Sequence, residues 1–215
     1  MLVAAGRRAN TDLLNLAAVG VQTDADGLVV VDPYLRSTNR RIFAAGDVCS
    51  RLQFTHHADA QARIVVQNAL FLPTATTRGL VIPHCTYTTP EVAQVGETAA
   101  ALEQAGRPFD SLRVDHAELD RGHAAGPDGG FVEVLLERGG SKILGATIVG
   151  RDAGELIAPL CMAMSLGLGI DAFGKTVLPY PTRSEALKRL ADQRNRGRLT
   201  PRAKRWFARW FRWTL

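Results

Sequence analysis

The sequence predicts an α+β protein built of two parts, and two observations support this class. The segment 73–79 is small and polar and is bounded by Pro73 and Gly79, which marks an internal boundary. Beyond it, strand patterns and helix patterns are grouped, which favours an antiparallel sheet with helices on one side. The expected strands are 92–95, 112–114, 131–136 and 143–149, and the expected helices are 98–105 and 153–168.

The first part is organised around the stretch RIFAAGDV at 41–48. Residues 42–45 are apolar and predict a short buried strand, which Gly46 ends where a backbone without Cβ can lie close to a ligand. Asp47 then follows at the carboxyl end of the strand, where a carboxylate can accept hydrogen bonds from sugar-type hydroxyls. A Gly-Asp pair is also common in ordinary turns, so the surrounding sequence must distinguish a ligand-binding site from a simple turn.

Three further elements are expected around this stretch. Residues 10–12 can cap a short helix over 13–18, and Val29 and Val31 fall on one face of a strand. Thr55 is a candidate N-cap for a helix over 56–72. The apolar residues that predict this helix by their spacing are Ala62, Val65, Val66, Ala69 and Leu70. The adjacent histidines at its start, His56 and His57, are by themselves more typical of solvent-facing or capping residues than of ligands.

In the second part, Gly139-Gly140 predicts a hairpin between two strands. The apolar helix near 156–166 contains Pro159 and is too short for a clean bilayer span, so we interpret it as a core or dimer-interface helix. One face of it indicates a homodimer contact and carries Ile157, Leu160, Met164 and Leu168.

The segment PYPTRSE at 179–185 has the pattern of a helix start. Thr182 and Glu185 have the spacing of a capping box and predict a helix over 183–194. Most sequences with this pattern have no role beyond starting a helix.

Composition limits the remaining chemistry. The three cysteines (Cys49, Cys85 and Cys161) form no CxxC pair, so a disulfide framework or a zinc site is not expected, and no metal site is predicted. The start of the chain lacks the order of a signal peptide, and we expect a cytoplasmic location. His84, His116 and His123 lack metal-ligand spacing and are interpreted as structural or surface residues.

Several motifs in a fixed order resemble the flavoprotein disulfide reductases, which are pyridine nucleotide-disulfide oxidoreductases. They are the stretches LVAAGRRANT (2–11), GLVVVD (27–32), RIFAAGDV (41–48), YTTPEVAQVG (87–96), ILGATIVG (143–150) and YPTRSE (180–185). The resemblance covers roughly 1–195 and divides the chain into three regions. Residues 1–73 resemble the carboxyl-terminal portion of an α/β FAD-binding domain, 80–195 resemble the dimerisation domain, and 196–215 form a tail outside the match.

The resemblance implies a role for the first region in FAD binding. In the family, the aspartate of the Ala-Gly-Asp segment binds the ribityl chain of FAD, which implies this role for Asp47 with its neighbours Gly46 and Val48. The helix after it points its amino end at the flavin, which makes His56 a weaker candidate. No GxGxxG turn or redox cysteine pair is present, so we expect NAD(P)H to bind a domain absent from this chain and the chain alone to be inactive.

In the family, the 179–185 loop reaches the partner subunit's active site, and its first residue is commonly a proton-exchanging histidine. Here that residue is Tyr180, and a phenol is a poor base at neutral pH. Tyrosine beside proline at this place resembles the mercuric-reductase-like members and argues against dithiol substrates. We therefore take Tyr180 and Glu185 as the catalytic candidates. The alternative is a dimerisation or binding module that has lost flavin, although such a module would have no physical reason to keep Asp47.

The tail, 196–215, carries the basicity of the chain. From Arg194 onward there are eight basic residues and no acidic one, so the preceding part has a net charge of 5 minus 8, which is −3. Pro201 can begin a helix whose aromatic residues share a face flanked by arginines. The aromatic residues are Trp206, Phe207, Trp210, Phe211 and Trp213, and the arginines are Arg202, Arg205, Arg209 and Arg212. Docking on the protein's own surface, peripheral membrane association and, as a distant third, nucleic-acid binding all fit this pattern.

Overall fold

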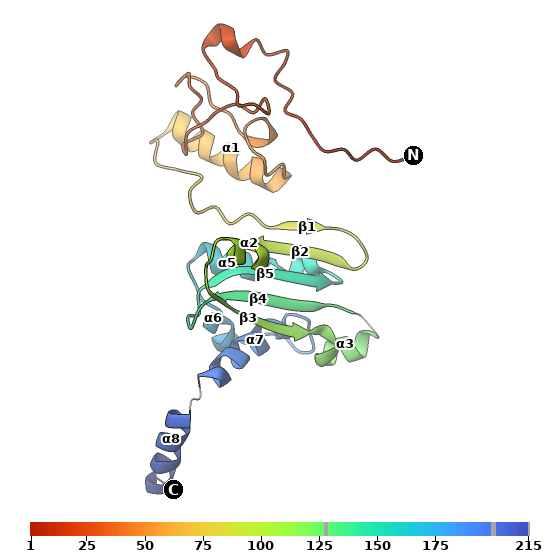
Figure 1. The fold of residues 1–215 in the computed structure, drawn as a ribbon, viewed down its shortest axis with the longest axis vertical. Helices are drawn as coiled ribbons and strands as arrows, with labels where there is room; N and C mark the ends of the chain where they lie inside the picture. Colours follow the sequence, from red (N-terminus) through yellow and green to blue (C-terminus); the bar gives the residue numbers. More distant parts are fainter. Residues whose placement is uncertain (127–128, 199–200, 215) are drawn as a thin grey trace. The chain divides into compact units, whose positions relative to one another are not determined.

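The computed structural model describes residues 1–126, 129–198 and 201–214, without the side chains of 201–204. These residues form two compact units, Met1–Leu80 and Val81–Leu215 (Figure 1).

A five-stranded antiparallel sheet dominates the second unit (Figure 1). Neighbouring strands follow the order β1-β2-β5-β4-β3. The strands are β1 (His84–Thr86), β2 (Glu91–Gly96), β3 (Phe109–Asp115), β4 (Phe131–Glu137) and β5 (Ile143–Gly150). The four predicted strands correspond to β2, β3, β4 and β5, and the α+β class is confirmed. The predicted hairpin joins β4 to β5, with the Gly140 amide donating to the Glu137 carbonyl at 2.8 Å.

The second unit contains seven helices within the described residues. They are α2 (Ala99–Gln104), α3 (Asp120–Ala125) after a 3-10 turn η3 (His116–Glu118), α4 (Ala153–Leu156), α5 (Ala158–Ser165), α6 (Asp171–Lys175), α7 (Glu185–Gly197) and α8 (Pro201–Thr214). Helix α7 contacts β3 and β4, whereas α4 contacts β2 and β5. Helix α8 begins at Pro201, as predicted. None of the helices in the described ranges is long and apolar enough to cross a membrane.

The main core lies between one face of the sheet and helices α4 to α7. Alternate strand residues point into it because successive side chains of a strand face opposite sides. These strand residues include Val95, Val114, Val134 and Ile148, and they pack with Leu160, Leu187 and Leu190 from the helices. On the other face, Leu102 of α2 packs with Leu135 and Leu144 in a smaller cluster.

The predicted helix over 153–168 is wrong as one continuous element. It divides into α4 and α5 at Ile157, two residues before Pro159. Proline lacks an amide hydrogen and its ring clashes with the preceding turn, so it is tolerated only near the start of a helix. The predicted dimer face is also wrong in part. Ile157 and Leu160 are buried in the unit's own core, while Leu168 is 45% exposed.

The predicted capping box is wrong as well. Ser184 is the N-cap of α7 and no side chain caps this helix end. The Thr182 hydroxyl instead donates to the Pro179 carbonyl at 2.7 Å, and Glu185 accepts a hydrogen bond from Arg189. Both side chains therefore form interactions within the loop and the first turn. The helix itself, predicted over 183–194, is present.

The first unit contains one long helix, α1 (Thr55–Leu70), and two 3-10 turns, η1 (Leu16–Val19) and η2 (Gly46–Val48). The strands expected at 29–31 and 42–45 are isolated bridges instead, such as Val31 with Ser37 and Arg36 with Phe43. No longer ladder pairs with them in the described part of this unit. The helix expected over 13–18 is reduced to the η1 turn, and the N-cap of α1 is Phe54 instead of Thr55.

The buried face of α1 is polar, which corrects the apolar face expected for this helix. His57, Gln61, Ile64 and Asn68 are buried, whereas Val66 and Leu70 are 51% and 73% exposed. The buried amides are satisfied by loop backbone. Asn68, for example, donates to the Ala75 carbonyl at 2.8 Å and accepts from the Ala75 amide at 3.1 Å. Hydrogen bonding thus decides which side of α1 faces the loops.

Candidate functional site

The η2 turn is fixed against α1 by a buried hydrogen bond. The Gly46 amide donates to Oε1 of Gln61 at 2.6 Å. Gly46 has φ of +83°, and a Cβ on it would lie 3.1 Å from the Ala58 Cβ. Glycine therefore meets both the left-handed backbone and the close approach to the helix. Because the carbonyl of Val48 accepts from the Val29 amide at 2.9 Å, both ends of the turn are held.

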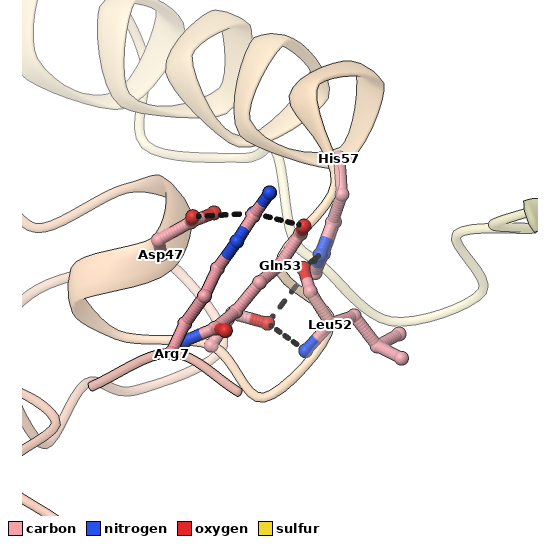
Figure 2. A network of polar contacts seen from close by, with 6 residues as sticks. Arg7, Asp47, Leu52, Gln53 and His57 are labelled. Atoms are coloured by element: carbon pink, nitrogen blue, oxygen red, sulfur yellow. Dashed lines mark hydrogen bonds and ion pairs between the residues drawn. The ribbon is translucent and has the colours of Figure 1, made fainter. Parts of the chain in front are cut away.

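Asp47 projects from this turn towards Arg7 (Figure 2). Nη1 of Arg7 lies 3.3 Å from Oδ2 of Asp47 and also donates to the Gln53 carbonyl at 3.0 Å. The side chains of Arg7 and Asp47 are 65% and 48% exposed, and an exposed ion pair contributes only about 0–1 kcal/mol. The carboxylate therefore stays accessible to another hydrogen-bond donor.

The two histidines at the start of α1 have different environments. His57 is buried, and its Nδ1 lies 2.9 Å from the Leu52 carbonyl (Figure 2). Since a carbonyl oxygen only accepts, Nδ1 carries the proton in this contact. The His56 ring stacks on Phe54 with a centroid distance of 5.4 Å. His57 thus holds the loop before the helix, and His56 lies exposed at the helix start.

Tyr180 in the second unit is oriented by Asp120. Its hydroxyl donates to Oδ2 of Asp120 at 2.6 Å. This hydrogen bond, followed by the negative charge of Asp120, raises the pKa of the Tyr180 phenol above its ordinary value. The phenol is consequently a hydrogen-bond donor, and not an anion, throughout the neutral pH range.

Glu185 lies in the first turn of α7, where the helix dipole favours a negative charge. Its Oε1 accepts from Nε of Arg189 at 2.8 Å, while its Oε2 is buried and has no hydrogen-bond partner in the described structure. Nη1 of Arg189 also donates to the Glu118 carbonyl at 2.6 Å. Tyr180, Glu185 and Arg189 line a pocket of about 470 Å³, so the two catalytic candidates border one cavity.

Four residues that shape these sites were not predicted from the sequence. Arg189 had a usable signal, because it lies four residues after Glu185 on a helix and has the opposite charge. The sequence contains no such signal for the other three residues, because their partners are distant along the chain. Arg7 lies 40 residues from Asp47, Gln61 lies 15 residues from Gly46, and Asp120 lies 60 residues from Tyr180.

Side chains that commonly ligate metals do not form a cluster in the part of the chain that the structure describes. There, no group of three or more His, Cys, Asp or Glu residues could hold a metal ion. Cys49, Cys85 and Cys161 are free thiols, and burial raises the pKa of Cys49 to about 11. A thiol with so high a pKa is protonated and a weak nucleophile at neutral pH. His116 is fully buried beside Gly130 and Gly150, in a structural position.

The η2 turn and the start of α1 together offer a hydrogen-bond acceptor and backbone donors. An ionised carboxylate is an acceptor only, and Asp47 offers one on a turn whose Gly46 amide is already bonded to Gln61. The start of α1 has no side-chain cap, so its first amide groups keep their partial positive charge. The residues present therefore fit a polyhydroxylated, negatively charged ligand.

Comparison with known proteins identifies both units. Residues 82–191 match the family model "Pyridine nucleotide-disulphide oxidoreductase, dimerisation domain". Residues 1–62 match the model "Pyridine nucleotide-disulphide oxidoreductase". The range 1–62 contains the η2 turn, and the range 82–191 contains the Tyr180 loop.

Relatives agree with these family matches. The chain is 38% identical over 192 residues to a mercuric reductase of Streptomyces lividans, covering 89% of this chain and 40% of the relative. It is 36% identical over 190 residues to a dihydrolipoyl dehydrogenase of Rhizobium etli, covering 87% of this chain and 39% of the relative. The chain thus spans about two fifths of the length of these relatives.

Solved structures share the fold. The HOCl-induced flavoprotein disulfide reductase RclA from Escherichia coli matches with a TM-score of 0.81 at 27% identity. The match covers 89% of this chain and 44% of RclA.

Proposed function

Since this chain belongs to the pyridine nucleotide-disulphide oxidoreductase family, we propose that it is the carboxyl-terminal portion of an FAD- and NAD(P)H-dependent oxidoreductase resembling mercuric reductase. In this proposal the first unit contacts the ribityl chain of FAD through Asp47. The second unit forms the homodimer and presents Tyr180 and Glu185 to the partner's active site. NAD(P)H binds a domain outside the chain, and the compartment is the cytoplasm.

The observation that carries the proposal is the construction of the η2 turn. Gln61 fixes the turn through the Gly46 amide, while Asp47 keeps a carboxylate with a side-chain exposure of 48%. A turn that served only the fold would have no need for an acidic group held outward by a buried amide. Binding FAD supplies redox chemistry, and Asp47 would hold and orient its sugar-like chain.

Tyr180 and Glu185 have complementary roles in this proposal. The phenol, kept protonated by Asp120, would exchange its hydrogen bond to Asp120 for one to the reacting group, since a phenol has a single proton to donate. Glu185 fixes Arg189, which in turn donates to the Glu118 carbonyl and ties α7 to the η3 turn, two residues before Asp120. Glu185 is therefore a positioning residue for the pocket that Tyr180 borders.

The homodimer proposal rests on apolar side chains that the unit's own core does not use. Met162, Leu166, Leu168 and Val177 are 61%, 66%, 45% and 93% exposed. They lie on α5 or in the segments that follow it. Burying them against a second copy would remove apolar surface from water, which stabilises association.

Replacing Asp47 with alanine should lower the affinity of the complete polypeptide that carries this chain for FAD by at least about tenfold, because a charge-assisted hydrogen bond typically contributes about 1.5–3 kcal/mol. The measurement is the ratio of flavin absorbance to protein in the purified variant, with a titration of added FAD.

Asp59→Ala is the matched control for this experiment. Asp59 is also an exposed aspartate paired with an arginine, Arg63, at 2.8 Å. It should keep full flavin content. Equal FAD occupancy in Asp47→Ala and the unaltered protein would remove Asp47 from the site, and a complete polypeptide without flavin would favour a dimerisation module.

Leu166→Asp should weaken the dimer of the 215-residue protein by at least about tenfold, because it places an unpaired charge against apolar surface. Sedimentation across micromolar concentrations measures the change. Leu13→Asp, at an exposed leucine of the first unit, is the control and should sediment as the unaltered protein does. A dimer that tolerates Leu166→Asp would place the interface elsewhere.

A further inference from the structure

Helix α8 is a separate amphipathic element outside both family matches. Its 14 residues, Pro201–Thr214, contain five basic residues and no acidic one. At a rise of about 1.5 Å per residue, a helix of this length is far shorter than a bilayer core. It is therefore long enough to lie along a surface but not to cross a membrane.

Aromatic rings form a continuous stripe along α8. Trp206 stacks on Trp210 with ring centroids 5.8 Å apart, and Trp210 contacts Trp213 edge-on at 5.9 Å. Phe207 stacks on Phe211 at 6.2 Å and meets Trp206 at 5.2 Å. The rings thus pack on one another along one side of the helix and not into a core.

This stripe remains exposed. The exposed fractions are 60% for Trp206, 46% for Trp210 and 81% for Trp213, with Phe207 and Phe211 at 40% and 54%. The five basic residues of α8 account for the whole net charge of +5, so the rest of the chain is neutral overall and has no excess negative charge to balance the helix. Among the described residues, no ion pair joins Arg205, Arg209 or Arg212 to an acidic side chain.

We propose that α8 binds the surface of an anionic phospholipid bilayer, lying in the interface with its aromatic stripe among the headgroups and acyl chains. Charge complementarity selects this occupant, because the exposed arginines match a negative surface. The tryptophans select it over a purely polar polyanion, since an amphipathic indole ring prefers the boundary between headgroups and hydrocarbon. The two features together define an interfacial helix.

The chain offers a direct optical test, because its three tryptophans all lie in α8. The 215-residue protein is mixed with vesicles of phosphatidylcholine alone, and with vesicles of phosphatidylcholine and phosphatidylglycerol in equal parts. Sedimentation and tryptophan emission are measured in low salt. We expect the protein to pellet with the anionic vesicles, with a blue-shifted emission, and to remain soluble with the neutral ones.

Arginine and tryptophan variants separate the contribution of charge to binding from the contribution of the aromatic side chains. The double variant Arg205→Gln/Arg209→Gln should weaken partitioning about thirtyfold, since each basic residue near an anionic surface contributes about a factor of five. Arg40→Gln/Arg41→Gln removes two exposed arginines from the first unit and should bind as the unaltered protein does. Trp206→Ala/Trp210→Ala should lose binding while retaining every charge.

Three results would overturn the proposal. Equal pelleting with neutral and anionic vesicles would exclude the charge match. An emission already blue-shifted without vesicles would show that the stripe is covered, by a second copy if the shift depends on protein concentration and by the protein's own surface if it does not. A single-stranded oligonucleotide that quenches the emission when anionic vesicles leave it unchanged would assign the helix to nucleic acid.

Discussion

Replacing Gly145 with alanine is expected to lower the free energy of unfolding by about 2–4 kcal/mol, within the range of severe overpacking. A Cβ at Gly145 would overlap the Glu97 carbonyl oxygen and lie 2.8 Å from the Glu97 amide nitrogen. That amide also donates to the Leu144 carbonyl at 2.9 Å. Both obstacles are backbone, so no flexible side chain can move aside. The end of β2 would have to separate from β5.

Urea or thermal denaturation, followed by circular dichroism, measures this effect. Gly197→Ala is the matched control, because no atom lies within 4 Å of a Cβ built there. Gly197 is the last residue of α7, and alanine in a helix should be neutral or stabilising by up to about 1 kcal/mol. If both variants unfold at the same midpoint, the close approach at Gly145 is not a constraint on the fold.

The sheet could be predicted from the sequence because its signal is local. Val132, Val134 and Ile148 alternate with less buried residues, and this period of two is visible without knowledge of any partner strand. The elements that were missed are β1, α3 and α6, which have 3, 6 and 5 residues. Segments this short contain less than two helical turns or too few alternations to distinguish them from loops.

Polar contacts over long sequence distances could not be predicted. The buried Gln61 on α1 has no apolar pattern, and its place depends on the Gly46 amide 15 residues away. The hydrogen bond from Tyr180 to Asp120 spans 60 residues. Family resemblance identified Asp47 and Tyr180 as candidates, but only the folded arrangement supplies Arg7 and Asp120 as their partners.

Local rules failed where a competing contact was available. Thr182 has the spacing of a capping residue, yet its hydroxyl donates to the Pro179 carbonyl within a turn. The apolar run 153–168 has helical spacing, but Pro159 restricts where a helix can begin. In both cases a local constraint other than the side-chain spacing determines where the helix begins.

The largest effect on catalysis is expected from Tyr180→Phe in the complete polypeptide that carries this chain. Removing a group that donates a proton or hydrogen bond typically lowers turnover by about 10²-fold or more. On the proposed function, the measurement is NAD(P)H oxidation with mercuric ion as the acceptor. Tyr87→Phe, at another exposed tyrosine of the same unit, is the control and should retain full turnover. Full turnover in Tyr180→Phe would exclude a catalytic role for the phenol.

Asp120→Asn tests how the phenol is held. The hydrogen bond and charge of Asp120 raise the pKa of Tyr180 because they oppose formation of the phenolate. Without that charge, the phenol should ionise at a lower pH, nearer its ordinary value of about 10. If the protonated phenol is the active form, turnover near neutral pH is largely kept and the alkaline fall in activity begins at lower pH. Ultraviolet titration of tyrosinate, compared with Tyr180→Phe to assign the signal, measures the shift directly. An unchanged alkaline limb together with an unchanged titration would show that Asp120 does not control the protonation of Tyr180.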